Sequence, residues 1–337
     1  FTVTLKYKKC ASFCDGALFT LLGKTAFGPG GELLLPWSYS GLEFKVRGRG
    51  IVIETGAHAA DYCDYLRVEI DGAGVKYPVC GGNIKIVTPY VADTEHTARI
   101  MRLTEGMESV TVKQIIAVGE DPAITCNTEK SKPSLMFIGD SITCGYGVDA
   151  PCDAPGFSTF EEDCTLSYAY MAARELGAEI LFTGASGKGI VANCEGNRED
   201  MTLVQAFDWE TRYGGEWDAG GYSPEAVVVN AGTNDAWGGV TDGEFYPAGM
   251  AFLAKIRKKF PHAPILWAYG IMDTSKLPCI KKIIEDFDKA NGNAYFLDCG
   301  CMTDHENETG GGGHPNVNTS LRVYPLLAEK LKTILGK

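Results

Sequence analysis

The sequence predicts an α/β protein, in which a three-layer α/β/α sandwich with a parallel sheet is preceded by a β-sandwich of the jelly-roll type. Short strand patterns separated by turns fill the first 128 residues, without a helix pattern of convincing length. From about residue 129, buried strand patterns alternate with amphipathic helix patterns. A polar, proline-containing stretch over 121–134 separates the two rhythms. We therefore predict a β-sandwich domain over 1–128 and an α/β domain over 129–337.

The strands of the first domain are predicted from alternating or β-branched residues. They lie at residues 1–8, 42–46, 50–54, 65–72, 84–87 and 109–119. Turn sequences such as Gly28-Pro29-Gly30-Gly31 and Asp71-Gly72 lie between them. Many short strands joined in this way are typical of a jelly roll.

The second domain shows βαβ order, which predicts a parallel, doubly wound sheet. Its strand patterns lie at residues 135–140, 178–187, 225–235, 263–272 and 293–302. Its helix patterns lie at residues 166–177, 245–260, 279–290 and 317–335. Ligands of such sheets bind at the carboxyl ends of the strands, so we expect the chemistry there.

The composition and net charge of the chain indicate which classes of molecule it can bind. The chain has 337 residues, of which 45% are hydrophobic and 22% charged, as in ordinary soluble proteins. No apolar run approaches the roughly 20 residues of a membrane helix. The formal net charge is -12 and no Lys/Arg cluster stands out. Phosphate binding needs a basic face, so we expect neither a nucleic acid nor a membrane as partner, and a neutral substrate instead.

The twelve cysteines match no zinc-binding spacing. Cys10 with Cys14, and Cys152 with Cys164, are spaced for loop-closing disulfides in an exported protein. The alternative is that most cysteines, Cys63 among them, are small buried hydrophobic residues. Both interpretations stay open.

Three strand ends carry residues suited to catalysis. Ser141 follows the first strand on a tight turn, with Asp140 expected to cap that turn rather than to react. Gly187 ends the second strand pattern, where a main-chain N–H can point at a ligand oxygen. Asn234 follows the third strand and has a side-chain amide for the same purpose. Taken singly, each is also compatible with ordinary turn chemistry.

His314 lies on a glycine loop, Gly310-Gly311-Gly312-Gly313, just before the last predicted helix. A histidine in this position is suited to act as a general base. His305, beside Asp304, is the competing candidate, although no glycine loop positions it.

Four sequence blocks, taken in order along the chain, resemble the motifs of the SGNH (GDSL-type) hydrolase superfamily. They are Gly139-Asp140-Ser141, Gly187, Gly232-x-Asn234-Asp235 and His314. Flanking stretches resemble one branch of it, carbohydrate esterase family 2. They include FIGDSITCGYGV, SGKG and HPNVNTS, together with the β-rich first half. The resemblance covers nearly the whole chain.

The resemblance implies a catalytic domain of the SGNH type over 129–337, with Ser141 as nucleophile and His314 as general acid and base. The main-chain N–H groups of Ser141 and Gly187 and the side chain of Asn234 would form the oxyanion hole. It also implies that no metal or cofactor is needed and that the substrate is an acetylated oligo- or polysaccharide. Trp237 follows Asn234-Asp235 closely, and its ring is suited to stack on a sugar.

One position departs from that pattern. Relatives have an Asp three or two residues before the histidine, where this chain has Gly311 and Gly312. Asp304 and Asp298 are the nearest upstream acids. A main-chain carbonyl of the glycine run is the alternative acceptor for Nδ1–H of His314, and we favour it over Asp304.

The expected function is removal of acetyl groups from plant polysaccharides such as xylan or glucomannan, at the 6-hydroxyl of the sugar. The competing functions are a non-catalytic polysaccharide-binding protein with a degenerate hydrolase domain, and a lipase or thioesterase of the same fold. We expect a secreted or cell-surface location, with the cytoplasm as the alternative.

Overall fold

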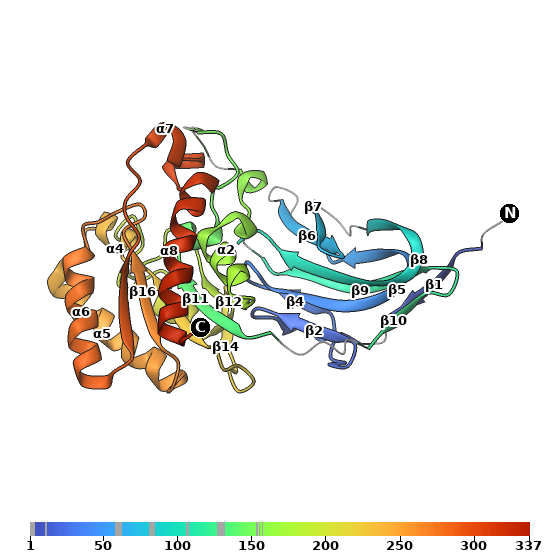
Figure 1. The fold of residues 1–337 in the computed structure, drawn as a ribbon, viewed down its shortest axis with the longest axis horizontal. Helices are drawn as coiled ribbons and strands as arrows, with labels where there is room; N and C mark the ends of the chain where they lie inside the picture. Colours follow the sequence, from blue (N-terminus) through green and yellow to red (C-terminus); the bar gives the residue numbers. More distant parts are fainter. Residues whose placement is uncertain are drawn as a thin grey trace. The chain divides into compact units, whose positions relative to one another are not determined.

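The computed structural model describes residues 4–10, 12–57, 63–80, 85–105, 108–126, 132–152, 154, 156 and 158–337, and the side chains of 85–91 are outside the description. Two compact units make up the chain, Phe1–Ser131 and Lys132–Lys337 (Figure 1). The predicted domain boundary between residues 128 and 129 lies outside the described residues.

The first unit is built on antiparallel strands, and its described residues contain no helix. The main path through the sheet runs β3-β4-β9-β5-β8-β6-β7, with β1 on β9 and with β2 and β10 on β5. The strands are β1 (Lys6–Lys9), β2 (Phe19–Leu22), β3 (Ala26–Phe27), β4 (Leu33–Leu35), β5 (Gly41–Thr55), β6 (Asp64–Ile70), β7 (Ala73–Val79), β8 (Lys85–Arg102), β9 (Val110–Gly119) and β10 (Ala123–Thr125).

The predicted strands at 42–46 and 50–54 are one strand, β5, so their separation was wrong. The pairing of β5 with β8 shifts register between Gly48 and Gly50. Side chains alternate between the faces of a strand, so an irregularity within a strand can move its inward positions from even to odd numbers. The buried apolar residues on either side of the shift are Leu42, Phe44 and Val46, then Ile51 and Ile53. Both halves of β5 thus contribute to one hydrophobic core.

The predictions also missed β2, β3, β4, β7 and β10, and the prediction at 84–87 covered only the start of β8. The three missed strands before β5 are four residues or fewer, too short to show a period of two.

The second unit contains the predicted parallel α/β sheet. Its order is β12-β11-β15-β16-β17, and every neighbouring pair is parallel. The strands are β11 (Ser134–Gly139), β12 (Glu179–Gly184), β15 (Ala226–Asn230), β16 (Ile265–Tyr269) and β17 (Ala294–Asp298), and a separate hairpin joins β13 (Trp209–Thr211) to β14 (Gly214–Glu216).

Helices cover both faces of this sheet. The long ones are α2 (Tyr168–Glu175), α5 (Asp242–Lys259), α6 (Leu277–Asn291) and α8 (Val317–Leu335), as predicted to within a few residues. The short ones are α1 (Ser141–Cys144), α3 (Leu203–Ala206), α4 (Thr233–Trp237) and α7 (His305–Glu308), with 3₁₀ turns η1 (Thr159–Glu161), η2 (Cys164–Leu166) and η3 (Gly311–Gly313). Within the described part of the chain, no helix has the length and apolar character needed to cross a membrane.

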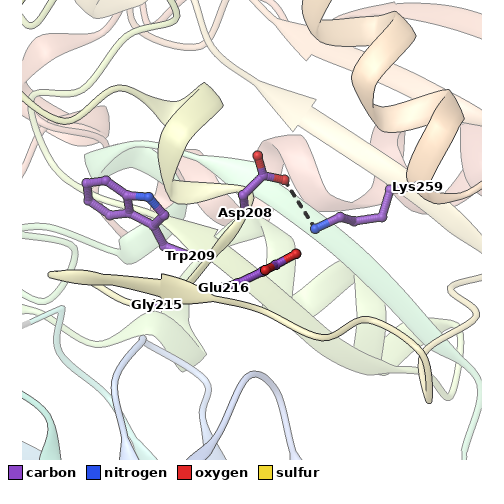
Figure 2. Close-up of a pocket in the computed structure, with 5 residues that line it drawn as sticks. All are labelled: Asp208, Trp209, Gly215, Glu216 and Lys259. Atoms are coloured by element: carbon purple, nitrogen blue, oxygen red, sulfur yellow. Dashed lines mark ion pairs between the residues drawn. The ribbon is translucent and has the colours of Figure 1, made fainter.

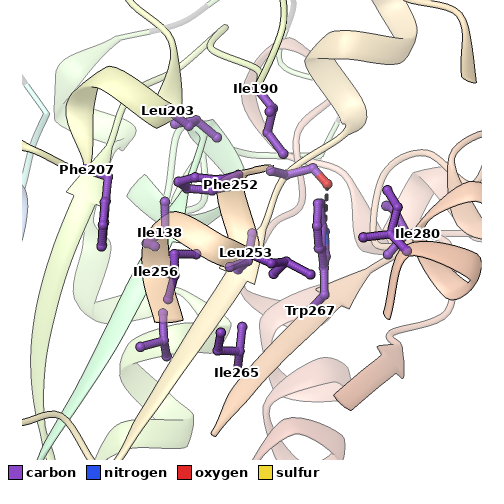
Figure 3. Packing of buried hydrophobic residues seen from close by; sticks show 14 of the residues in the cluster. Ile138, Ile190, Leu203, Phe207, Phe252, Leu253, Ile256, Ile265, Trp267 and Ile280 are labelled. Carbon is purple, nitrogen blue, oxygen red and sulfur yellow. Dashed lines mark hydrogen bonds between the residues drawn. The ribbon is translucent and has the colours of Figure 1, made fainter. Parts of the chain in front are cut away.

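The layers follow from the alternation of side chains along each strand. Helix α5 packs on α6, and α2 packs on α8, on opposite sides of the sheet (Figure 1). Met136 and Ile138 of β11 belong to the cluster formed with α5 and α6, which Figure 3 shows around Phe252 and Trp267. The Trp267 indole N–H donates to the carbonyl of Ala231 at 3.0 Å, so this fully buried ring has its polar atom satisfied.

A buried ion pair lies in the first unit. The Arg102 guanidinium donates to both carboxylate oxygens of Asp64, at 3.0 and 2.9 Å, and to the carbonyl of Leu35 at 2.7 Å. Neither side chain of the pair is exposed to solvent. Such a pair contributes little over an apolar replacement, but removing one partner leaves the other charge buried.

We predict that Asp64→Ala lowers the free energy of unfolding by about 3–5 kcal/mol, because the buried Arg102 guanidinium then loses the carboxylate to which it donates two hydrogen bonds. Urea unfolding of the full chain, followed by circular dichroism, measures this change. The matched control is Asp121→Ala, which removes an exposed partner of Arg47 and should cost less than about 1 kcal/mol. Equal losses in the two variants would contradict the prediction.

Candidate active site

Three neighbouring strands end at the same level of the parallel sheet. Gly139 of β11 pairs with Gly184 of β12 on one side and with Asn230 of β15 on the other. Ser141, Gly187 and Asn234 follow these three positions by two to four residues. The sequence-predicted residues therefore emerge together at the carboxyl edge of the sheet.

Ser141 is held on a capped turn. Asp140 is the N-cap of α1, and its Oδ1 accepts from the N–H of Ile142 at 3.1 Å. The predicted capping role of Asp140 is thereby confirmed.

The structure brings Ser141 and His314 together. Nε2 of His314 lies 2.9 Å from Oγ of Ser141. At this distance the imidazole can take the hydroxyl proton, which is the requirement for activating a serine nucleophile.

His314 reaches Ser141 because the backbone at Gly147 packs directly against the backbone at Gly310 and Gly311, with no side chain between them. The N–H of Gly311 donates to the carbonyl of Gly147 at 3.0 Å. A Cβ atom on Gly310 would lie 2.2 Å from that carbonyl oxygen, and one on Gly147 would lie 2.6 Å from the carbonyl oxygen of Gly311. Both positions therefore exclude any residue larger than glycine.

Main-chain oxygen orients the histidine ring. Nδ1 of His314 lies 3.2 Å from the carbonyl oxygen of Gly312, whose φ of 62° is in the left-handed region. Asp304 instead accepts from the side-chain amide of Asn307 at 2.7 Å. The contact with the glycine run is the one that we favoured from the sequence.

Tyr146 is a further neighbour of the histidine that sequence reasoning left without a role. Its ring centroid lies 4.3 Å from that of His314, with the planes tilted by 39°. Tyr146 is five residues after Ser141, so the loop after the nucleophile also limits the rotation of the imidazole.

The predicted oxyanion donors lie in one neighbourhood. Within the described residues, the main-chain N–H groups of Ser141 and Gly187 have no hydrogen-bond acceptor. The amide Nδ2 of Asn234 donates to Oδ2 of Asp140 at 2.9 Å and to the carbonyl of Lys188 at 3.0 Å. Asp140 directly precedes Ser141, and Lys188 directly follows Gly187. A primary amide has two hydrogens, so a donation from Asn234 to a substrate would be shared with one of these bonds or would replace it.

Asp235 is a residue whose role sequence reasoning missed. Its carboxylate is buried and accepts from the main-chain N–H groups of Ile190, Val191 and Ala192, at 2.9, 2.7 and 3.2 Å. Burial raises the pKa of Asp235 above its ordinary value, although the three N–H groups partly oppose this shift. The carboxylate thus fixes the loop that follows Gly187.

The remaining candidates are Trp237 and His305. Trp237 is the last residue of α4 and is 51% exposed, so its ring is available to a ligand. His305 is exposed at the start of α7, and its carbonyl accepts from Thr309.

A pocket of about 440 Å³ lies away from these residues in the sequence, and its lining consists of Asp208, Trp209, Gly215, Glu216 and Lys259 (Figure 2). Lys259 ends α5 shortly before β16 begins, so this pocket lies toward the amino ends of the strands. Asp208 bonds with Lys255 and with Lys259. None of the predicted catalytic residues lines it.

The parallel sheet and the order of the motifs along it place the chain in the class of SGNH hydrolases. The GDSL-like lipase/acylhydrolase family matches residues 137–317, and the chain belongs to this family.

Relatives with assigned names are esterases. The chain is 29% identical over 214 residues to the cellulase/esterase CelE of Acetivibrio thermocellus, covering 60% of this chain and 26% of CelE. It is 23% identical over 250 residues to an acetylxylan esterase / glucomannan deacetylase of Cellvibrio japonicus, covering 72% of this chain and 68% of that protein. The chain thus spans about a quarter of CelE.

A solved structure has the same fold over nearly the whole chain. It is a family two carbohydrate esterase from Clostridium thermocellum in complex with cellohexaose, with a TM-score of 0.86 and 22% identity. The alignment covers 94% of this chain and 99% of that one.

We predict that Asp235→Asn lowers kcat on a small acetyl ester by about 100-fold, because an amide N–H then faces N–H donors and the Gly187 loop shifts. KM should stay nearly unchanged if the loop acts on the transition state. Steady-state kinetics with p-nitrophenyl acetate give both constants.

The control is Asp286→Asn, which removes a carboxylate on α6 that accepts from Lys282 of the same helix and from the Tyr246 hydroxyl of α5. It should keep the wild-type kcat. Wild-type kcat in Asp235→Asn, or a rise in KM alone, would contradict the positioning role.

Proposed function

We propose that the chain is a carbohydrate O-acetylesterase that removes acetyl groups from plant polysaccharides such as xylan and glucomannan, at the primary 6-hydroxyl. The observation that carries the proposal is the 2.9 Å contact between His314 Nε2 and Ser141 Oγ at the carboxyl edge of the sheet. The names of the related esterases support the substrate class. The net charge of -12 also fits a neutral glycan better than an anionic polymer.

In the proposed reaction, His314 takes the proton of Ser141 while Oγ attacks the acetyl carbonyl carbon. The C–O bond to the sugar then breaks, and His314 gives its proton to the departing sugar oxygen. Water, deprotonated by His314, attacks the acetyl-serine and releases acetate, which regenerates the free hydroxyl of Ser141.

The main-chain N–H groups of Ser141 and Gly187 are the proposed donors to the tetrahedral oxyanion. Their lack of other acceptors in the described residues supports this assignment. Asn234 would join them by exchanging its bond to Asp140 or to Lys188 for one to the substrate oxygen. Loss of one such donor typically lowers the rate by about 100- to 1,000-fold.

In this proposal the main chain of the glycine run orients the histidine of the Ser141–His314 pair. The Gly312 carbonyl accepts from Nδ1 and leaves Nε2 unprotonated toward Ser141. A carbonyl dipole stabilises the imidazolium less than a carboxylate in the same place would.

Further parts of the assignment are also proposals. Trp237, half exposed on α4, would stack on a sugar ring of the substrate. The antiparallel unit would be a jelly-roll β-sandwich. A polysaccharide substrate fits a secreted or cell-surface protein.

Acetate release from acetylated glucomannan and acetylated xylan tests the function. We expect the wild-type chain to release acetate from both, and Ser141→Ala and His314→Ala to lower the rate by at least about 10⁴-fold. Asp304→Ala should keep most of the activity, because its carboxylate bonds with Asn307 instead of the histidine.

Each other outcome has a distinct meaning. Full activity in Ser141→Ala would overturn the mechanism, and loss of activity in Asp304→Ala would transfer the orienting role to that acid. Glycan retention on an affinity gel without acetate release would indicate a binding protein. A preference for long acyl chains over acetyl would indicate a lipase or thioesterase.

A carboxylate placed at residue 312 should interact directly with the imidazole of His314. A Cβ atom at Gly312 would lie 3.8 Å from Nδ1 of His314, within the reach of an Asp side chain. The new negative charge favours the imidazolium and so raises the pKa of His314. We predict that Gly312→Asp moves the acid limb of the kcat/KM profile to higher pH by about one unit.

Gly312→Ala is the matched control, because it introduces the same strain at positive φ without the charge. Its acid limb should stay where it is in the wild type, and kcat of the Asp variant should exceed that of the Ala variant. Identical profiles for the two variants would show that position 312 does not reach the histidine.

A further inference from the structure

Two cysteines lie opposite each other at the open end of the β6–β7 hairpin. The two strands pair antiparallel from Ile70↔Ala73 beside the turn to Asp64↔Val79 at the far end. Cys63 directly precedes Asp64, and Cys80 directly follows Val79. Continued by one residue, the same register makes Cys63 and Cys80 the next cross-strand pair.

The side chains are also neighbours. The Cys63 thiol lies close enough to the Cys80 thiol and to the Tyr65 hydroxyl to interact with both electrostatically, and its sulfur lies 3.7 Å from the carbonyl oxygen of Asp64. Tyr65 is two residues after Cys63 and therefore points to the same side of the strand. Both cysteines are free and partly exposed. The sequence had offered no reason to pair Cys63 with any other cysteine.

The backbone geometry suits a covalent link. Residues opposite each other on antiparallel strands have Cα atoms about 4.5–5.5 Å apart. Disulfides form when this separation is about 4.4–6.8 Å. Rotation of the two side chains is therefore enough to bring the sulfurs to bonding distance.

We propose that Cys63 and Cys80 form a site of oxidative modification, at which a small disulfide such as oxidised glutathione converts the two thiols into a cross-strand disulfide. The inference goes beyond the proposed esterase function and does not depend on it.

The chemistry is two successive thiol–disulfide exchanges. One cysteine loses its proton, and its thiolate attacks a sulfur of glutathione disulfide, which forms a mixed disulfide and releases one glutathione thiolate. The second cysteine, also deprotonated, attacks the protein sulfur of the mixed disulfide and releases the second glutathione. The protein is oxidised by two electrons, and the glutathione disulfide is reduced to two thiols.

The surroundings slow the reaction without preventing it. Burial and the contact with Cys80 raise the pKa of Cys63 to about 11. Burial and the neighbouring thiols raise the pKa of Tyr65 to about 12. Little thiolate exists at neutral pH, so the pair should stay reduced in a thiol-rich compartment and close gradually in an oxidising one.

Peptide mapping of the full wild-type chain tests the site without any variant. Trypsin cleaves after Arg49, Arg67, Lys76 and Lys85, so peptides 50–67 and 77–85 each contain a single cysteine. After equilibration with oxidised glutathione at pH 8.5 and alkylation of the remaining thiols, we expect these two peptides to be linked. The link should disappear on treatment with dithiothreitol.

Thermal unfolding provides the second measurement. The oxidised wild type should unfold about 5 °C higher than the reduced protein, because the bond restricts the unfolded chain. This difference should vanish in Cys63→Ser and in Cys80→Ser and persist in Cys14→Ser, which changes an exposed cysteine. Activity on p-nitrophenyl acetate should be equal in both redox states.

The absence of the linked peptide after equilibration would overturn the proposal. The proposal would also be overturned if Cys63 or Cys80 were linked to other cysteines as often as to each other, because that result would indicate nonspecific oxidation. If the disulfide forms but the protein shows no esterase activity in either redox state, the result would count against the proposed function and not against the disulfide.

Discussion

The hydrogen bond between Ser141 and His314 joins residues that are 173 positions apart, and it depends on a contact between two backbones. Gly147 follows the nucleophile turn, Gly310 and Gly311 precede the histidine, and the two segments touch with no room for a Cβ atom between them. The N–H of Val317 also donates to the carbonyl of Val148, which ties the start of α8 to the same loop. The geometry of the Ser141–His314 contact is thus set mainly by main-chain atoms.

A second set of main-chain contacts fixes the other side of the site. Asn234 and Asp235 are adjacent in the first turn of α4, and together they bond with four main-chain groups of residues 188–192, the Lys188 carbonyl and the N–H groups of Ile190, Val191 and Ala192. Asn234 also bonds with Asp140 beside the nucleophile. One dipeptide thereby connects the ends of three strands.

The sequence predicted the parallel sheet, its long helices and the motif order, because each depends on local periodicity and on strand ends that come level in a parallel sheet. It also favoured the glycine-run carbonyl as the partner of His314. The roles of Asp235 and Tyr146 were missed because they rest on contacts with residues more than 40 and more than 160 positions away, which no local pattern encodes. The catalytic roles themselves, unlike the contacts, remain predictions.

The Gly312 carbonyl has a consequence for how such sites tolerate mutation. Every amino acid carries a carbonyl, so no codon change at this position deletes the atom that accepts from Nδ1. A side-chain carboxylate, in contrast, is lost by a single substitution. The contact is instead sensitive to substitution of the residues that shape the loop, Gly147 and Gly310, because a Cβ atom at either position collides with the opposing backbone. A survey that searched only for an acidic residue beside the histidine would overlook a main-chain contact of this kind.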